Sequence, residues 1–167
     1  EAGNTSVPST GLPITIDTTA PAAPLITTTT SLTKINTPTI TGTTAPGTTV
    51  QLLDGDNVLG EVIAANDGSF SITSSVLADD IYTLTVRATD LAGNVSAESV
   101  GLPIEIDTTA PAQPSITTDI ALTKINTPTI TGTAEAGSTV ELFNGSDSLG
   151  TVVAADNGTF SITSSVL

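Results

Sequence analysis

The side chains in this sequence that could do chemistry are carboxylates and amides, because the chain has 17 acidic residues and neither histidine nor cysteine. Asp90 and Asp107 each follow a stretch with strand-like alternation, and Asn94 lies four residues after Asp90. We expect these three side chains to lie at one pole of a β-sandwich, beside a segment with free carbonyl groups. Ca²⁺ takes six to eight oxygen ligands in proteins. The sequence therefore predicts a Ca²⁺ site that contains Asp90, Asn94 and Asp107.

The same pattern occurs once more, nearer the N-terminus. Asp17 lies ninety positions before Asp107 (107 − 17 = 90), and Asn4 lies ninety positions before Asn94. We therefore expect Asp17 to be a metal ligand at the other end of the module. The alternative is that Asp90 and Asn94 only make hydrogen bonds within a turn, and that Asp107 caps the segment that follows it.

Several further aspartates fall in predicted turns, where some could complete a metal site from a facing module. Of these, Asp67 in the Asn-Asp-Gly turn is also taken as a candidate metal ligand. Ordinary turn hydrogen bonding is the simpler account of the whole group, and none of them has the spacing of an EF-hand loop. The group consists of Asp54, Asp56, Asp67, Asp79 and Asp80.

The net charge of −14 limits the classes of partner. With 3 basic residues the chain cannot neutralise phosphates, so nucleic acid and anionic lipid headgroups are not expected as partners. A cation suits such a surface, although acidity that only keeps the protein soluble is the alternative. An enzyme is not expected, because no histidine or cysteine can act as base or nucleophile. No apolar run is long enough to cross a membrane, so direct membrane insertion is not expected either.

The chain contains an internal repeat. Residues 16–24, which include Pro21 and Pro24, return with one change as residues 106–114, and two prolines so close together cannot lie inside a sheet. We therefore interpret this stretch as a short linker between copies of one module. Residues 17–106 form a complete repeat, and residues 107–167 form an incomplete repeat that lacks its last two strands. Residues 1–16 are expected to be the C-terminal strand of a preceding repeat, which makes the chain a piece of a longer protein.

The complete repeat has the pattern of an all-β module. Thr, Ser, Val and Ile dominate, hydrophobic residues alternate with period two, and Gly, Pro, Asn and Asp mark the turns. Tyr82 lies just inside the sixth predicted strand, where the tyrosine corner of immunoglobulin-like sandwiches occurs. The sequence therefore predicts tandem immunoglobulin-like seven-stranded β-sandwiches joined by short proline-containing linkers. The expected strands are 25–29, 37–43, 48–53, 58–64, 69–73, 81–89 and 95–106.

Four motifs in the repeat carry a resemblance to a known family. They are Asp-Thr-Thr-Ala-Pro at 17–21, Ile-Thr-Gly-Thr at 40–43, Phe-Ser-Ile at 70–72 and Ala-Thr-Asp-Leu-Ala-Gly-Asn at 88–94. Together they resemble the bacterial Ig-like repeats of giant Gram-negative surface adhesins, of the biofilm-associated and RTX-adhesin type. The resemblance implies a secreted stalk on the bacterial cell surface, in which Ca²⁺ at the junctions stiffens a row of repeats. It implies a structural role as a spacer that supports cell adhesion and biofilm formation, with neighbouring repeats of the same chain as partners.

Two other functions remain open from the sequence. The Thr-rich faces or the variable turns could make the repeat a ligand-binding module for glycan, ice or another cell. The incomplete second repeat exposes strand edges, which could pair with another chain and cause self-association by strand exchange.

Overall fold

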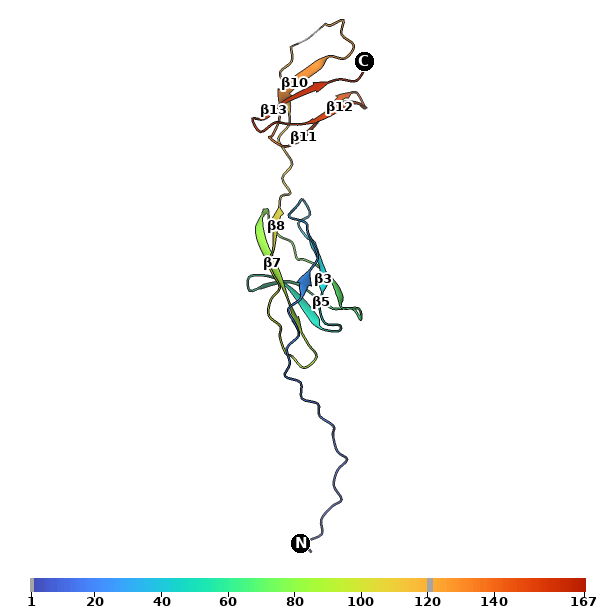
Figure 1. The fold of residues 1–167 in the computed structure, drawn as a ribbon, viewed down its shortest axis with the longest axis vertical. Coiled ribbons are helices and arrows are strands. Elements are labelled where there is room, and N and C mark those ends of the chain that lie inside the picture. The colour runs from blue at the N-terminus through green and yellow to red at the C-terminus, as the bar shows by residue number, and fades with distance from the viewer. Residues whose placement is uncertain (1, 120–121) are drawn as a thin grey trace. The chain divides into compact units, whose positions relative to one another are not determined.

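The computed structural model describes residues 2–119 and 122–167, and the chain divides into two compact units, residues 1–108 and 109–167 (Figure 1). All the regular elements in the described residues are β-strands. None of these residues forms a helix that is long and apolar enough to cross a membrane. The expected all-β class is therefore confirmed.

Unit 1, residues 1–108, is a sandwich of two sheets. The smaller sheet has the strand order β1-β3-β6, and the larger one has the order β2-β8-β7-β4-β5. All pairs are antiparallel except β2 with β8, which is parallel. This is the two-sheet arrangement of immunoglobulin-like domains. The strands are β1 Leu25–Ile26, β2 Leu32–Thr33, β3 Thr39–Thr43, β4 Thr49–Asp54, β5 Asn57–Ile63, β6 Ser69–Thr73, β7 Asp80–Thr89 and β8 Leu102–Ile106.

The core of unit 1 lies between the two sheets and follows from the period-two alternation of the strands. Alternate residues of β3, β6 and β7 are buried, while the Thr and Ser residues between them face solvent. The buried cluster consists of Ile40, Val50, Leu52, Ala64, Phe70, Ile72, Leu77, Leu84, Val86, Ile104 and Ile106.

The expected first strand at 25–29 is in fact the first of two short strands, β1 and β2, one in each sheet. A threonine hydroxyl explains where β1 ends. Thr28 Oγ1 accepts the hydrogen bond from the Thr41 backbone N–H at 2.8 Å, in the position of a backbone carbonyl. The ladder with β3 stops there, and the chain crosses to the other sheet. With β1 and β2 counted as one split strand, the unit has the predicted seven.

The last predicted strand, 95–106, is regular only in its second half, β8. Its first half runs beside β7, and serine hydroxyls replace backbone acceptors there. Ser96 Oγ accepts from the Ala88 N–H at 2.9 Å, and Ser99 Oγ accepts from the Val86 N–H at 3.1 Å. At the start of β7, the Tyr82 hydroxyl donates to the Ala78 carbonyl at 3.2 Å, which is the hydrogen bond of a tyrosine corner.

The strand register defines two poles of unit 1. Thr49 pairs with both Ile63 and Thr89, so the loops at 44–48, 64–68 and 90–94 share one end of the sandwich, called here the proximal pole. Asp80 pairs with Ile106, so the start of β7 and the end of β8 share the opposite end, the distal pole. The chain therefore enters the sandwich at the proximal pole and leaves it at the distal pole.

Unit 2, residues 109–167, repeats β1, β3, β4, β5 and β6 of unit 1 in the same register. In the described residues it has no counterpart of β7 and β8. The core is correspondingly smaller, so Phe143 is 54% exposed where its counterpart Leu53 is 1% exposed. The strands are β9 Ser115–Ile116, β10 Thr129–Thr133, β11 Thr139–Asn144, β12 Asp147–Val153 and β13 Thr159–Thr163.

The N-terminal segment 2–24 contains no strand. Its hydrophobic side chains at Val7, Leu12, Ile14 and Ile16 are exposed. The idea that residues 1–16 are the last strand of a preceding repeat stays a prediction.

Candidate functional site

The turn that follows β7 is fixed by its own sequence. Asp90 Oδ1 accepts hydrogen bonds from the backbone N–H groups of Ala92 at 2.9 Å and Asn94 at 2.8 Å. Asn94 Nδ2 donates to Asp90 Oδ2 at 2.9 Å. Gly93 has a φ of 90°, a conformation that favours glycine. The motif Asp-Leu-Ala-Gly-Asn thus folds into a turn with its two polar side chains bonded to each other.

Asp17 joins this turn from the N-terminal linker. Asn94 Nδ2 also donates to the backbone carbonyl of Asp17 at 3.1 Å, which ties the linker to the proximal pole. The Asp17 carboxylate accepts from the Thr19 N–H at 2.9 Å. The structure therefore brings together three of the five predicted ligands, Asp17, Asp90 and Asn94, and the expectation that Asp17 lies at the other end of the module is wrong.

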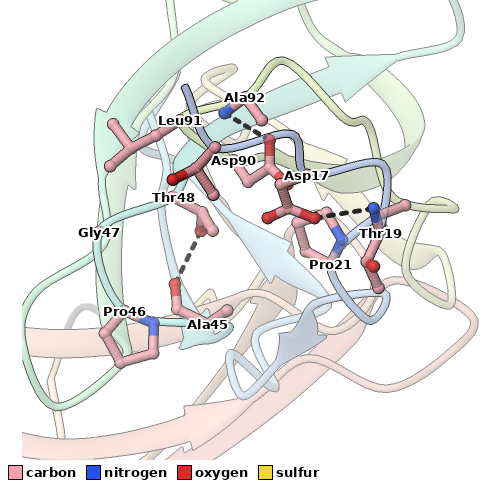
Figure 2. A pocket seen from close by; sticks show the side chains of 12 residues that line it. Asp17, Thr19, Pro21, Ala45, Pro46, Gly47, Thr48, Asp90, Leu91 and Ala92 are labelled. Carbon is pink, nitrogen blue, oxygen red and sulfur yellow. Dashed lines mark hydrogen bonds between the residues drawn. The ribbon is translucent and has the colours of Figure 1, made fainter. Parts of the chain in front are cut away.

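The linker and two loops surround an open depression of about 670 Å³ at the proximal pole (Figure 2). Its lining comes from linker residues within 15–21, from residues 45–48 and from residues 90–92. In Figure 2, Asp17 lies between Asp90 on one side and Thr19 and Pro21 on the other. Leu91, at the tip of the turn, is 100% exposed. Asp17 and Asp90 therefore both line an accessible hollow.

The hydrogen bonds of these turns favour the ionised carboxylates. The hydrogen bond from the Asn94 side chain, helped by backbone N–H groups of the turn, lowers the pKa of Asp90 against the opposing effect of desolvation. The Ser69 hydroxyl lowers the pKa of Asp67 in the same way. Both side chains therefore carry a full negative charge at neutral pH.

Asp107 does not belong to the group, so the prediction that it shares a pole with Asp90 and Asn94 is wrong. The backbone N–H of Asp107 donates to the Thr33 carbonyl at the distal pole, next to Ile106 and Asp80. Asp90 lies beyond the other end of β7. Nine residue steps along that strand span roughly 30 Å at about 3.3 Å each, whereas a Ca²⁺–oxygen bond is about 2.4 Å. One ion therefore cannot bind both aspartates of the same module.

Asp67 lies at the proximal pole but in a separate turn. Its Oδ1 accepts from the Ser69 N–H at 2.9 Å and from Ser69 Oγ at 2.7 Å. It does not contribute to the lining of the depression beside Asp17 and Asp90. The structure thus does not bring Asp67 together with the other candidates.

A polar contact at the distal pole was not predicted from the sequence. Thr108 Oγ1 donates to Asp79 Oδ1 at 2.7 Å, so the segment leaving β8 is bonded to the corner before β7. The contact could have been predicted from the antiparallel order of the last two strands, because this order places residue 107 near residue 80.

The donor set at the proximal pole suits a hard cation but is incomplete. Asp17 and Asp90 supply carboxylate oxygen atoms, the type of ligand that Ca²⁺ prefers. Among the described residues no three Asp, Glu, His or Cys side chains gather in a way that could hold a metal. The Asp90 carboxylate already accepts three hydrogen bonds, so turn hydrogen bonding alone accounts for the positions of Asp90 and Asn94.

Comparison with known families agrees with the two-unit division. Residues 26–108 match the family described as bacterial Ig-like domain, and residues 110–166 match the one described as bacterial Ig domain. The chain belongs to the bacterial Ig-like domains. Such domains are typically non-catalytic structural modules.

One curated protein and two solved structures are similar to this chain. Exoglucanase B of Cellulomonas fimi is 36% identical in an alignment of 126 residues that covers 68% of this chain, and the chain spans only 12% of the length of that protein. The fibronectin(III)-like modules of Clostridium thermocellum CbhA have a TM-score of 0.50 at 14% identity, over 84% of this chain and 78% of that one, and share its fold. A biofilm associated protein, in its BSP domain, has a TM-score of 0.35 at 19% identity, over 86% of this chain and 24% of that one.

Proposed function

We propose that this chain is a spacer segment of an extracellular bacterial surface protein of the adhesin type, stiffened by Ca²⁺ at the junctions between its Ig-like modules. The observation that supports the proposal is the path of the chain through unit 1. The chain enters this unit at one pole and leaves it at the other. Modules joined in this way extend the chain instead of folding back on it. The chain itself has no catalytic role in this proposal.

Each junction ion would bind Asp17, Asp90 and Asn94 of one module, completed by carbonyl groups of the linker and by water. The Asn94 hydrogen bond to the Asp17 carbonyl supports this grouping, because it already holds the linker against the module. Asp107 corresponds to Asp17 in the repeat and would serve the next junction. Without the ion the two carboxylates repel each other, and binding removes that repulsion.

The experiment uses three tandem copies of residues 17–106, so that each internal junction contains Asp17, Asp90 and Asn94. Small-angle scattering with Ca²⁺ should give a longer and stiffer particle than scattering with EDTA. Asp90→Ala in the middle copy should restore flexibility at one junction, whereas Asp56→Ala, in a hairpin turn outside the site, should not. Identical scattering curves with and without Ca²⁺ would reject the proposal.

A second candidate is an accessory module of a polysaccharide-degrading enzyme, because the 36% identical relative is an exoglucanase. The module could then be a spacer there too, or it could bind the polysaccharide. A sedimentation assay with insoluble cellulose separates these roles. Retention of this chain on cellulose would favour a ligand-binding module, and recovery of all the protein in the supernatant would favour a spacer.

A further inference from the structure

The two repeats differ at two turns in a way that has a chemical consequence. The first repeat has Asp54-Gly55 and Asp67-Gly68, where the second has Asn144-Gly145 and Asn157-Gly158. In an Asn-Gly pair the backbone nitrogen of the glycine can approach the side-chain carbonyl carbon of the asparagine, because glycine has no Cβ in the way. In the structure, the two Asn-Gly pairs differ in how freely the glycine nitrogen can approach the asparagine side chain.

The Asn144-Gly145 pair lies at the tip of the hairpin that joins β11 and β12. Asn144 pairs with Asp147, which leaves Gly145 and Ser146 as a two-residue loop, and Gly145 has a φ of 61°. Asn144 and Gly145 are exposed, and a Cβ added at Gly145 would meet nothing within 4 Å. In the part of the chain that the structure describes, neither the Asn144 side chain nor the Gly145 N–H makes a hydrogen bond.

The Asn157-Gly158 pair is held by three hydrogen bonds. The Gly158 N–H donates to the Ala155 carbonyl at 2.8 Å. Asn157 Oδ1 accepts from the Thr159 N–H at 3.1 Å and from Thr159 Oγ1 at 2.8 Å. The attacking nitrogen and the attacked amide are both engaged, so a reaction here must first break this turn.

The structure assigns Asn144 as a site of spontaneous deamidation. The Gly145 nitrogen bonds to Cγ of Asn144 and gives up its proton, while the Cγ–Nδ2 bond breaks and ammonia leaves. Water then opens the resulting five-membered succinimide at either carbonyl, which yields aspartate or isoaspartate. The net reaction consumes one water, releases one ammonia and adds one negative charge.

The first repeat indicates that this hairpin accepts the aspartate product. Asp54 occupies the equivalent position and pairs with Asn57 in the same register as Asn144 with Asp147. Gly55 has a φ of 55°, close to that of Gly145. Deamidation to aspartate therefore gives position 144 the residue that the first repeat has at position 54, and only the isoaspartate product inserts an additional backbone atom.

The test is incubation of the native chain at mildly alkaline pH, followed by mass spectrometry of its peptides. We expect Asn144 to gain the mass of deamidation roughly tenfold faster than Asn157, the ratio set by one to two hydrogen bonds that must break. Asn126, which is followed by Thr127, is the internal control and should change more slowly than either. In concentrated urea the rates of Asn144 and Asn157 should converge, because the turns are lost.

Two results would overturn the assignment. One is equal native rates for Asn144 and Asn157, and the other is a native rate for Asn144 no higher than that of Asn126. Asn144→Gln supplies an independent check, because the longer side chain would have to close a larger ring. Its charge variants on an ion-exchange column should accumulate roughly tenfold more slowly than those of the parent, as expected if Asn144 is the fast site.

Discussion

Gly42 is the position where one added methyl group should perturb unit 1 most directly. A Cβ at Gly42 would lie 2.2 Å from the Leu25 carbonyl oxygen and 2.4 Å from the Phe70 ring. The first neighbour is backbone in the β1–β3 ladder, and the second is a ring that is only 5% exposed. Neither can move away without loss of pairing or of core packing, so the Gly42→Ala variant should be clearly less stable than the parent.

The expected loss follows from the two ways in which the structure can relax. Either β1, which pairs with β3 through only two residues, detaches, or the Phe70 ring turns and leaves a gap. Overpacking of this kind costs about 1–3 kcal/mol, and the smaller entropy of the unfolded alanine chain returns about 0.4–1 kcal/mol. The midpoints of these two ranges leave a net loss of about 1.3 kcal/mol, which lowers the Tm of a domain of this size by roughly 5–10 °C.

The assay is calorimetry of the full chain with a matched glycine variant. Gly11→Ala is the control, because a Cβ there meets nothing within 4 Å and its φ lies outside the positive range. Its free energy of unfolding should stay within about 0.5 kcal/mol of the parent. A Gly42→Ala chain as stable as the Gly11→Ala chain would refute the packing described for β1, β3 and β6.

Two further predictions concern hydrogen bonds of unit 1. Tyr82→Phe removes the bond to the Ala78 carbonyl and should cost about 1 kcal/mol in urea unfolding; an unchanged midpoint would show that this tyrosine corner adds no stability. The hydrogen bond from Asn94 lowers the pKa of Asp90 in the folded protein below its ordinary value of 3.8. The ionised carboxylate therefore stabilises the fold at pH values above 3.8, and this stabilisation is lost as the pH falls through the lower pKa of the folded state. In Asn94→Ala the pKa of Asp90, followed by NMR, should rise toward the ordinary value, and an unaltered titration would contradict the assigned cause.

Much of the fold of unit 1 follows from local patterns in the sequence. Strands β3, β4, β6 and β7 agree with prediction to within two residues at each end, because strict alternation fixes the face of each side chain. The split into β1 and β2 was not predictable from alternation. It depends on the Thr28 hydroxyl competing with the backbone for the Thr41 N–H, a contact between residues thirteen apart.

The site was predictable where it is local and not where it depends on strand direction. Asp90 and Asn94 share a turn because they are four residues apart on either side of a glycine. Asp107 follows the next strand along the chain, and antiparallel neighbours end at opposite poles. The prediction of a shared pole therefore failed for a topological reason. For the same reason Asp17, which was expected at the other end of the module, lies at the proximal pole beside Asp90 and Asn94.

The most direct measurement is calorimetry of the full chain in millimolar Ca²⁺ and in EDTA, for the parent and for Asp17→Asn and Asp107→Asn. Extracellular Ca²⁺ sites bind with a Kd of about 10⁻⁴–10⁻³ M, and about 1 mM Ca²⁺, up to a tenfold excess over Kd, adds at most about 1.4 kcal/mol. The Tm of unit 1 should then rise by up to roughly 6–11 °C in the parent and in Asp107→Asn, and not in Asp17→Asn. No rise in the parent, or a rise lost only in Asp107→Asn, would contradict the assignment of the junction ion to the proximal pole.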